Sequence, residues 1–589
     1  MDIVRGGFRW QIADDFVDRA SLLLGNTGLR LAEWLAEGRA SLVKQTPHRA
    51  VYRVVLPEVD LHVKHYRGEW RDWPRRLFRP SRARREYLLG RMVAERGLPT
   101  LDVLACGDAS LIHSLDSFLI TRTLPDSISL LDFLQSEFWR LPQPQRERLR
   151  QQLARKIGQL LARMHQASIR HQDLHAGNLL LRFQGEIPEL FLIDLGYVQL
   201  GAPLDWPASR DNLSMLDRWF APRWSRTDRR RACRAYCQMR PDIPLPEKQV
   251  AFQVEQLTHA WMLGQIDHAT RRTLGGNRHF RRIIAGTSRG YAATDVDHAA
   301  LAELLANPDV PFEQAVLAGA DANRRAGSMA VRLWKHSRTS TVIEMELLVG
   351  GKVRPVICKR VPLRCWKERL AALFRPSSVV RGYLHGQGLR QRGLPSPRPL
   401  AVWHRRSWLG LPETGYLIQE KVLQAMDLHA YFLSLIKTPR AESFAKRCRV
   451  IDELARLLRI LHRWQLSHRD LKAANILVSP QPWKLADRGV AEVAFDPLSE
   501  WPHVWFIDVD GLRKNTPLTQ ERRIRDLARL LVSFTGHPAL TRCDCLRFLR
   551  SYLMRREYGR HSWKVWWRTI AQAAGQKIER NRRLGRVVG

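Results

Sequence analysis

The chain has 589 residues, more than a single hydrophobic core usually supports, so two domains are expected. Hydrophobic residues make up 45% of the sequence, which excludes a chain that is disordered throughout. The excess of 96 Lys and Arg over 58 Asp and Glu gives a formal charge of +38. Such a charge favours anionic partners, namely nucleic acid, a phospholipid surface or a phosphorylated glycolipid, and does not choose among them.

Membrane spans and secretory signals are not expected from the sequence. No window approaches the roughly 18 consecutive apolar residues that a span requires. The opening residues carry Asp14 and Asp15 where a secretory signal would need an apolar run. The 8 cysteines form neither a disulfide framework nor a set of paired zinc ligands. We therefore expect a cytoplasmic protein.

A long internal repeat is the most informative feature of the sequence. FRPSRARREYLLGRMVAERGLPT begins at Phe78 and returns as FRPSSVVRGYLHGQGLRQRGLPS at Phe374, an offset of 374 − 78 = 296. HQDLHAGNLLL begins at His171 and returns as HRDLKAANILV at His468, an offset of 468 − 171 = 297. The near-constant offset predicts a duplicated domain, because solenoid repeats have much shorter periods.

Weaker matches suggest where the two copies end. RDNLSMLDRWF at Arg210 aligns with RDLARLLVSF at Arg525, and GNRHFRR at Gly276 aligns loosely with RNRRLGR at Arg580. These matches predict domains at 1–290 and 291–589, with an insertion in the second copy between residues 479 and 505.

The first predicted elements of copy one carry a lysine and a glutamate. LHVKHY reads as a short strand with Lys64, and SRARREYLLGRMVAER reads as a helix that carries Glu86. The next helix, QRERLRQQLARKIGQLLARMHQ, has one apolar stripe at helical spacing and should face a core. The stripe consists of Leu149, Leu153, Ile157, Leu160, Leu161 and Met164.

A polar loop and a predicted hairpin follow that helix. The loop HQDLHAGN carries Asp173 and Asn178, and the runs NLLLRF and ELFLIDLG flank the turn QGEIP. The second run ends in Asp194. This order of helix, loop, strand and strand lets the three polar side chains converge, which one regular helix face would not allow.

Convergent side chains of these types suit phosphoryl transfer from Mg-ATP to a hydroxyl group. We assign Asp173 as the base that orients the acceptor, and Asn178 and Asp194 as ligands of Mg²⁺, which prefers hard oxygen donors. Lys64 would contact the nucleotide phosphates. Glu86 would hold Lys64 in place as its ion-pair partner.

The second copy repeats most of this set after its own amphipathic helix, RVIDELARLLRILHRW. Asp470 is the predicted base, Asn475 and Asp508 are the predicted metal ligands, and Lys359 of VICKRV is the predicted phosphate contact. The buried stripe of the helix should consist of Ile451, Leu454, Leu458 and Leu461.

The second copy departs from the first at the glutamate. Gly382 occupies the position of Glu86, so Lys359 lacks the expected acid and the second copy could be a weak kinase, recruit a substitute acid or be a binding domain. Asp510, beside Asp508, is a possible extra ligand. We therefore expect the first copy to be the more active one.

HQDLHAGN with FLIDLG, and HRDLKAAN with FIDVDG, resemble the catalytic and metal-binding loops of the protein-kinase-like superfamily. REYLLGRMVAERGLPT is similar to the lipopolysaccharide kinases of the Kdo/WaaP family. This resemblance implies an α+β fold with two tandem bilobal domains, each with a β-rich and a helical lobe. It also implies ATP and Mg²⁺ as cofactors, a lipid A-linked core sugar as acceptor, and peripheral location on the inner face of the cytoplasmic membrane, with nucleic acid an unlikely partner.

Two other functions remain open at this stage. HRDLKAAN, with Lys472 two residues after Asp470, is closer to protein Ser/Thr kinases, whereas His175 in the first copy is closer to small-molecule kinases. A pseudokinase scaffold that binds polyanions is the non-enzymatic alternative, because neither lysine follows a GxGxxG loop. The acceptor, the active copy and the oligomeric state are left open.

Overall fold

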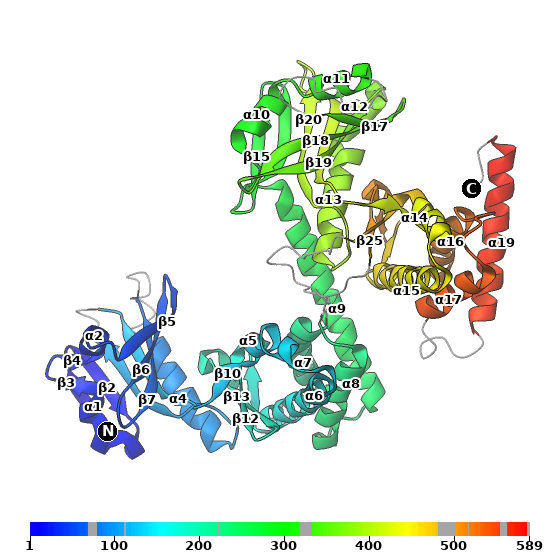
Figure 1. The fold of residues 1–589 in the computed structure, drawn as a ribbon. Coiled ribbons are helices and arrows are strands. Elements are labelled where there is room, and N and C mark those ends of the chain that lie inside the picture. The colour runs from blue at the N-terminus through cyan, green and yellow to red at the C-terminus, as the bar shows by residue number, and fades with distance from the viewer. Residues whose placement is uncertain are drawn as a thin grey trace. The chain divides into compact units, whose positions relative to one another are not determined.

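The computed structural model describes residues 1–68, 73, 79–110, 114–221, 223–318, 331–480, 502–515, 517–553 and 562–585. It divides into two compact units, Met1–Trp261 and Met262–Gly589, and the boundary falls inside helix α9 (Glu247–Arg271). Each unit has a lobe built on a large sheet and a lobe that is mainly helical (Figure 1).

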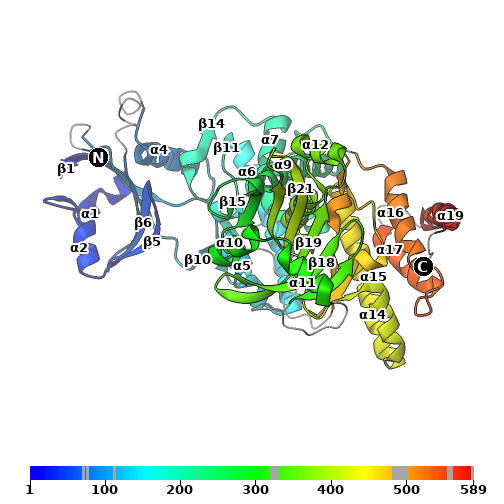
Figure 2. The same ribbon diagram turned by 90° about the horizontal axis from the view of Figure 1, so that it is seen from above.

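The first sheet has seven antiparallel strands in the order β1-β2-β8-β9-β7-β6-β5. Helices α1, α2 and α4 and the short hairpin β3-β4 accompany it; Figure 2 shows α4 beside the sheet. The elements are β1 (Asp2–Arg5), β2 (Phe8–Ile12), α1 (Ala20–Leu23), β3 (Leu24–Gly25), β4 (Gly28–Leu29), α2 (Leu31–Ala36), β5 (Ala40–Thr46), β6 (Arg49–Val55), β7 (Asp60–Tyr66), α4 (Arg82–Glu95), β8 (Val103–Ala109) and β9 (Ser117–Arg122).

Strand alternation determines which way the lysine faces. Leu61 and Val63 of β7 are buried in a core with Trp34 of α2, on one face of the sheet. Tyr66 is buried with Tyr87 of α4 in a separate cluster on the other face. Since successive side chains of a strand point to opposite faces, the side chain of Lys64, the residue after Val63, faces α4.

The helical lobe of the first unit contains the predicted loop and hairpin. All six residues of the predicted apolar stripe of α6 are buried, so the prediction of a core-facing helix is confirmed. The elements are β10 (Ser127–Ser129), α5 (Leu130–Gln135), α6 (Gln143–Gln166), β11 (Ile169–His171), β12 (Leu179–Gln184), β13 (Ile187–Leu192), β14 (Val198–Leu200), α7 (Trp206–Phe220), α8 (Arg226–Met239) and α9. β12 and β13 pair antiparallel, as the sequence predicted.

The second sheet repeats the first strand for strand, in the order β15-β16-β20-β21-β19-β18-β17. α13 takes the place of α4, and the duplication is confirmed at the level of topology. The elements are β15 (Phe280–Ala285), β16 (Ser288–Ala293), α10 (His298–Ala306), α11 (Val310–Ala318), β17 (Arg332–His336), β18 (Thr341–Val349), β19 (Lys352–Pro362), α12 (Trp366–Phe374), α13 (Ser378–Gln391), β20 (Pro399–Arg406) and β21 (Pro412–Glu420).

The helical lobe of the second unit likewise follows the first. The predicted stripe of α15 is buried at all four positions. The elements are β22 (Met426–Asp427), α14 (Leu428–Ser434), α15 (Arg440–Arg463), β23 (Leu466–Ser467), β24 (Ile476–Ser479), β25 (His503–Phe506), β26 (Arg513–Lys514), α16 (Gln520–Val532), α17 (Arg542–Leu553) and α19 (Ser562–Arg583). Most of the predicted insertion, 481–501, lies outside the described residues.

The division between the units lies earlier than the sequence indicated. The position 290/291 falls within β16, which pairs with β15 and β20 in the sheet of the second unit. Residues 276–282 run into the first three residues of β15, whereas their supposed counterparts from Arg580 end α19. The match between these two basic segments therefore reflects similar composition and not equivalent structure.

Candidate active site

Hairpin register brings Asn178 and Asp194 together. Leu179 pairs with Leu192 at the start of the hairpin, and the backbone N–H of Ile193 donates to the carbonyl of Asn178 at 3.0 Å. Asp194 comes next, with φ of 61°, a left-handed conformation that is uncommon outside glycine. Backbone strain of this kind is frequent at functional sites.

Asp173 lies in the same loop and is joined to Asn178. The amide nitrogen of Asn178 donates to the carbonyl of Asp173 at 2.8 Å. The side chain of Asp173 is 59% exposed, and His175 Nε2 lies 3.9 Å from its carboxylate. An exposed carboxylate beside a fixed amide is accessible to a hydroxyl acceptor.

The histidine before the aspartate supports the loop from within. His171 is fully buried, and burial lowers the pKa of its ring, so it is neutral at physiological pH. Its Nδ1 accepts the N–H of Asp173 at 3.2 Å. Asn212 of α7 donates to the carbonyl of His171 at 2.6 Å. These bonds fix the loop that carries Asp173.

Lys64 and Glu86 form the expected ion pair. The two side chains meet at 2.5 Å, and only 5% of the glutamate side chain is exposed. The hydroxyl of Tyr66 donates to the other oxygen of the same carboxylate. Lys64 also lies 3.6 Å from Asp194. The lysine is therefore held beside the strand-end aspartate by a buried acid that is itself braced.

Arg49 is a second cation at this site, and the sequence analysis missed it. It starts β6 after the turn that stands where a glycine-rich loop was sought, and its Nη1 lies 3.1 Å from Asp194 Oδ1. Thr46 Oγ1 closes the turn on Arg49. Although burial opposes ionisation, the charges of Lys64 and Arg49 hold the pKa of Asp194 below its usual range. A lone arginine in a polar turn gives no sequence signal of this contact.

The second copy assembles its loop in the same way. The N–H of Ile507 donates to the carbonyl of Asn475 at 3.0 Å, and Asp508 has φ of 52°. The amide of Asn475 donates to the carbonyl of Asp470 at 2.9 Å and to its carboxylate at 3.0 Å. Lys472 lies 3.0 Å from the same carboxylate. The three polar residues thus converge in this copy too.

The network around the second lysine differs throughout. Lys359 Nζ contacts Asp508 directly at 2.6 Å. Strand register pairs Lys359 with Val342, as Lys64 pairs with Val51, so Ser340 stands in the place of Arg49. By the same register Val361 replaces Tyr66. The cation, the hydroxyl and the helix acid of the first site are all absent at these equivalent positions.

The support for the buried histidine also differs between the copies. His468 is buried, and its backbone N–H donates to the carboxylate of Asp526 of α16 at 2.9 Å, where the first copy uses Asn212. The sequence match of RDNLSM with RDLARL aligned Asp526 with Asp211, which is one residue before Asn212. Asp211 instead pairs with Arg210 at 3.1 Å.

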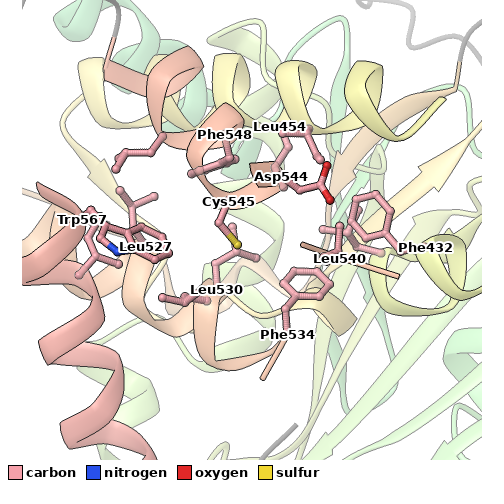
Figure 3. A pocket seen from close by; sticks show the side chains of 15 residues that line it. Phe432, Leu454, Leu527, Leu530, Phe534, Leu540, Asp544, Cys545, Phe548 and Trp567 are labelled. Atoms are coloured by element: carbon pink, nitrogen blue, oxygen red, sulfur yellow. The ribbon is translucent and has the colours of Figure 1, made fainter. Parts of the chain in front are cut away.

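Each helical lobe also encloses an apolar pocket, distinct from these loops. In the second unit Phe432, Leu527, Phe534 and Trp567 line it, with Asp544 at one side (Figure 3). Asp544 contacts Arg447 at 3.2 Å. In the first unit the pocket likewise includes one acid paired with an arginine, Asp217 with Arg229 at 3.0 Å. None of the predicted site residues lines either pocket.

Part of the positive charge is neutralised locally. Arg229 contacts Glu255 as well as Asp217, and Arg231 contacts Asp228 at 2.8 Å.

Within the described residues no helix is long and apolar enough to cross a bilayer.

Both loops present side-chain oxygens of the kind that suit magnesium. Asn178 commits its amide nitrogen to Asp173, which leaves its oxygen available as a donor, and the pKa of Asp194 is held below its usual range. Asn475 and Asp508 offer the same pair of oxygen donors. An amide and a carboxylate oxygen match the preference of Mg²⁺, which keeps further positions for phosphate oxygens and water.

Comparison with known proteins places this geometry in a family. A model of the lipopolysaccharide kinase (Kdo/WaaP) family matches residues 36–236 and 367–552, one segment in each unit. Together the segments make up more than half of the chain.

Individual relatives match shorter stretches. The 3-deoxy-D-manno-octulosonic acid kinase of Haemophilus influenzae (strain PittEE) is 35% identical over 112 residues, 19% of this chain and 42% of that protein. The enzyme of that name from Actinobacillus succinogenes is 39% identical over 172 residues, 28% of this chain and 58% of its own length. The chain thus aligns with about half the length of these curated relatives. A solved structure described as WaaP in complex with acyl carrier protein is 21% identical, with a TM-score of 0.32, and the match covers 44% of this chain and 97% of that one.

Proposed function

Because the chain belongs to the lipopolysaccharide kinase (Kdo/WaaP) family, we propose that it transfers the γ-phosphate of ATP to a sugar hydroxyl of a lipopolysaccharide core or lipid A-linked acceptor. The observation that carries the proposal is the ion pair of Lys64 with Glu86, 3.6 Å from Asp194. Phosphoryl transfer needs positioning and charge stabilisation more than covalent chemistry, and this cluster provides both.

Each side chain of the first site has a role in the proposal. Lys64, oriented by Glu86, would contact the upstream phosphates, and Arg49 would approach them from the β5-β6 turn. Asp173 would accept a hydrogen bond from the acceptor hydroxyl and receive its proton as the hydroxyl oxygen bonds to the γ-phosphorus and the bond from that phosphorus to ADP breaks. Asn178 and Asp194 would hold Mg²⁺, which when bound neutralises charge on the phosphates.

We propose that the first copy has the main activity, because its lysine has an ion-pair acid of its own on the neighbouring helix. We further propose that the protein works in the cytoplasm at the inner face of the membrane, where its formal charge of +38 would favour anionic glycolipids. The sequence features that suggested a protein kinase or a scaffold find no support among the relatives above.

The test is phosphorylation of a purified lipid A-linked Kdo acceptor by the full chain with Mg-ATP. Asp173→Asn should lower the rate about 10³-fold, as expected when a positioned base is lost. Asp211→Asn is the matched control, because Asp211 lies on α7 and pairs with Arg210 outside the site. Unchanged phosphorylation in Asp173→Asn, or none with wild-type protein, would remove the proposal.

A further inference from the structure

The second copy lacks a helix acid but has an extra acid close to the same point. In the first copy the helix position is Glu86, and the second position after the strand-end aspartate is Gly196. In the second copy the helix position is Gly382, and the second position after the strand-end aspartate is Asp510. Each copy thus has one carboxylate and one glycine, in opposite places.

The two positions are neighbours in both units. A β-carbon placed on Gly196 would lie 3.8 Å from Glu86 Oε2. A β-carbon placed on Gly382 would lie 3.8 Å from the Cβ of Asp510. An acid on the helix and an acid on the loop therefore occupy adjoining space and could serve the same lysine.

Helix α13 is tied to the loop that carries Asp510. Arg381 donates from Nε to the carbonyl of Asp510 at 3.2 Å. His385 donates from Nδ1 to the carbonyl of Val509 at 2.8 Å. These bonds, one from each side of Gly382 on the helix, hold Asp510 against the glycine.

Lys359 needs a partner of this kind once nucleotide binds. It now pairs with Asp508 at 2.6 Å, the residue assigned to the metal ion. If Asp508 turns to the ion, Lys359 loses that partner. Asp510 lies against the helix position that corresponds to Glu86, from which the acid of the first copy contacts its lysine. Glu86 performs this task in the first copy, so Lys64 would keep a partner when Asp194 turns to the ion.

We propose that the second copy retains a nucleotide-binding site in which Asp510 is the positioning residue for Lys359, in place of the missing helix acid. This deepens the proposed function, on which it rests, by assigning the second copy a nucleotide site built on a relocated carboxylate. The arrangement is an exchange of acid and glycine between helix and loop.

The test measures binding of the non-hydrolysable probe Mg-AMPPNP to the full chain by calorimetry, and it requires no acceptor. With the first site blocked by Lys64→Ala and Asp194→Ala, one site should remain. Adding Asp510→Asn should weaken that site about tenfold, because the carboxylate charge is lost while the shape is kept. Glu413→Gln is the control, since Glu413 pairs with Arg369 elsewhere on the sheet. No remaining site, or an unchanged dissociation constant in Asp510→Asn, would overturn the proposal.

The exchange can also be made in the first copy, where space permits it. A β-carbon on Gly196 meets only the Glu86 carboxylate, so Glu86→Gly with Gly196→Asp should be sterically tolerated. Glu86→Gly alone should weaken probe binding at the first site, and adding Gly196→Asp should recover most of the loss. Absence of recovery in a folded double variant would contradict the equivalence. These readouts are binding constants, so the proposal for the second site can fail while acceptor phosphorylation by the first copy is observed. Acceptor phosphorylation can likewise be absent while the binding results are as expected.

Discussion

The two lysine sites show how one fold can hold the equivalent strand lysine by different means. Lys64 is 15% exposed and is held by a buried glutamate, with Arg49 occupying the strand-end aspartate. Lys359 is 24% exposed and pairs with the strand-end aspartate itself. Lys64 would therefore keep its acid when nucleotide binds, whereas Lys359 would have to exchange Asp508 for another partner. Sheet topology is common to both, so the difference lies in a few side chains.

Arg49 offers the sharpest way to change the first site toward the second. Arg49→Ser installs the residue of the second copy, Ser340, and removes a cation that would face the phosphates. We expect KM for ATP to rise about tenfold with a smaller change in kcat, as when one charge contact to the nucleotide is lost. Steady-state kinetics at varied ATP would measure it.

The control for this change lies on the same strand. Arg53 contacts Asp60 at 2.6 Å, away from Asp194, so Arg53→Ser should leave KM for ATP near the wild-type value. Equal effects of the two substitutions would mean that the strand tolerates neither and that Arg49 has no special role at the nucleotide.

The buried histidines should make the two helical lobes respond differently to acid. Burial lowers the pKa of His165 to about 4, and its partner Asn212 is neutral. The unfolded chain therefore takes up this proton from about pH 6.5 downward while the folded unit resists until about pH 4, so stability falls across that window, by about 3 kcal/mol at most. His462 has Asp526 at 3.5 Å, whose charge opposes the lowering of its pKa by burial.

Hydrogen exchange of α6 and α15 peptides between pH 7 and pH 4.5 would read each lobe separately. After correction for the intrinsic rate, α6 should lose more protection than α15. Asn212→Asp should reduce the loss in α6 by raising the pKa of His165, and Asp526→Asn should increase it in α15. Identical pH profiles in all three proteins would show that these pairs do not set the acid response.

Much of this site could be predicted from sequence, for identifiable reasons. The apolar stripe before HQDLHAGN and the hairpin after it depend on local periodicity, which predicted that Asp173, Asn178 and Asp194 would meet. The same periodicity placed Lys64 on a strand and Glu86 on the next helix. Local patterns of this kind survive in a single sequence.

The remaining features depend on contacts across the fold. Arg49 reaches Asp194 across 145 sequence positions, and nothing near either residue signals the pairing. Asn212, and not Asp211, supports His171, because a shift of one residue rotates a helix position by about 100° and changes the face it occupies. The relation of Gly382 to Asp510 likewise appears only when α13 is packed against the loop. The match of RDNLSM with RDLARL rests on their shared Arg-Asp pair, and it therefore selected the wrong residue of α7 as the counterpart of Asp526.

The first copy is proposed to be the more complete phosphotransferase, and comparison of the two loop aspartates tests this most directly. Acceptor phosphorylation should be measured under single-turnover conditions in the wild type, Asp173→Asn, Asp470→Asn and the double variant. We expect Asp173→Asn to remove nearly all of the transfer and Asp470→Asn to leave most of it. Loss of transfer in Asp470→Asn alone, with Asp173→Asn still active, would contradict this assignment of the main activity to the first copy.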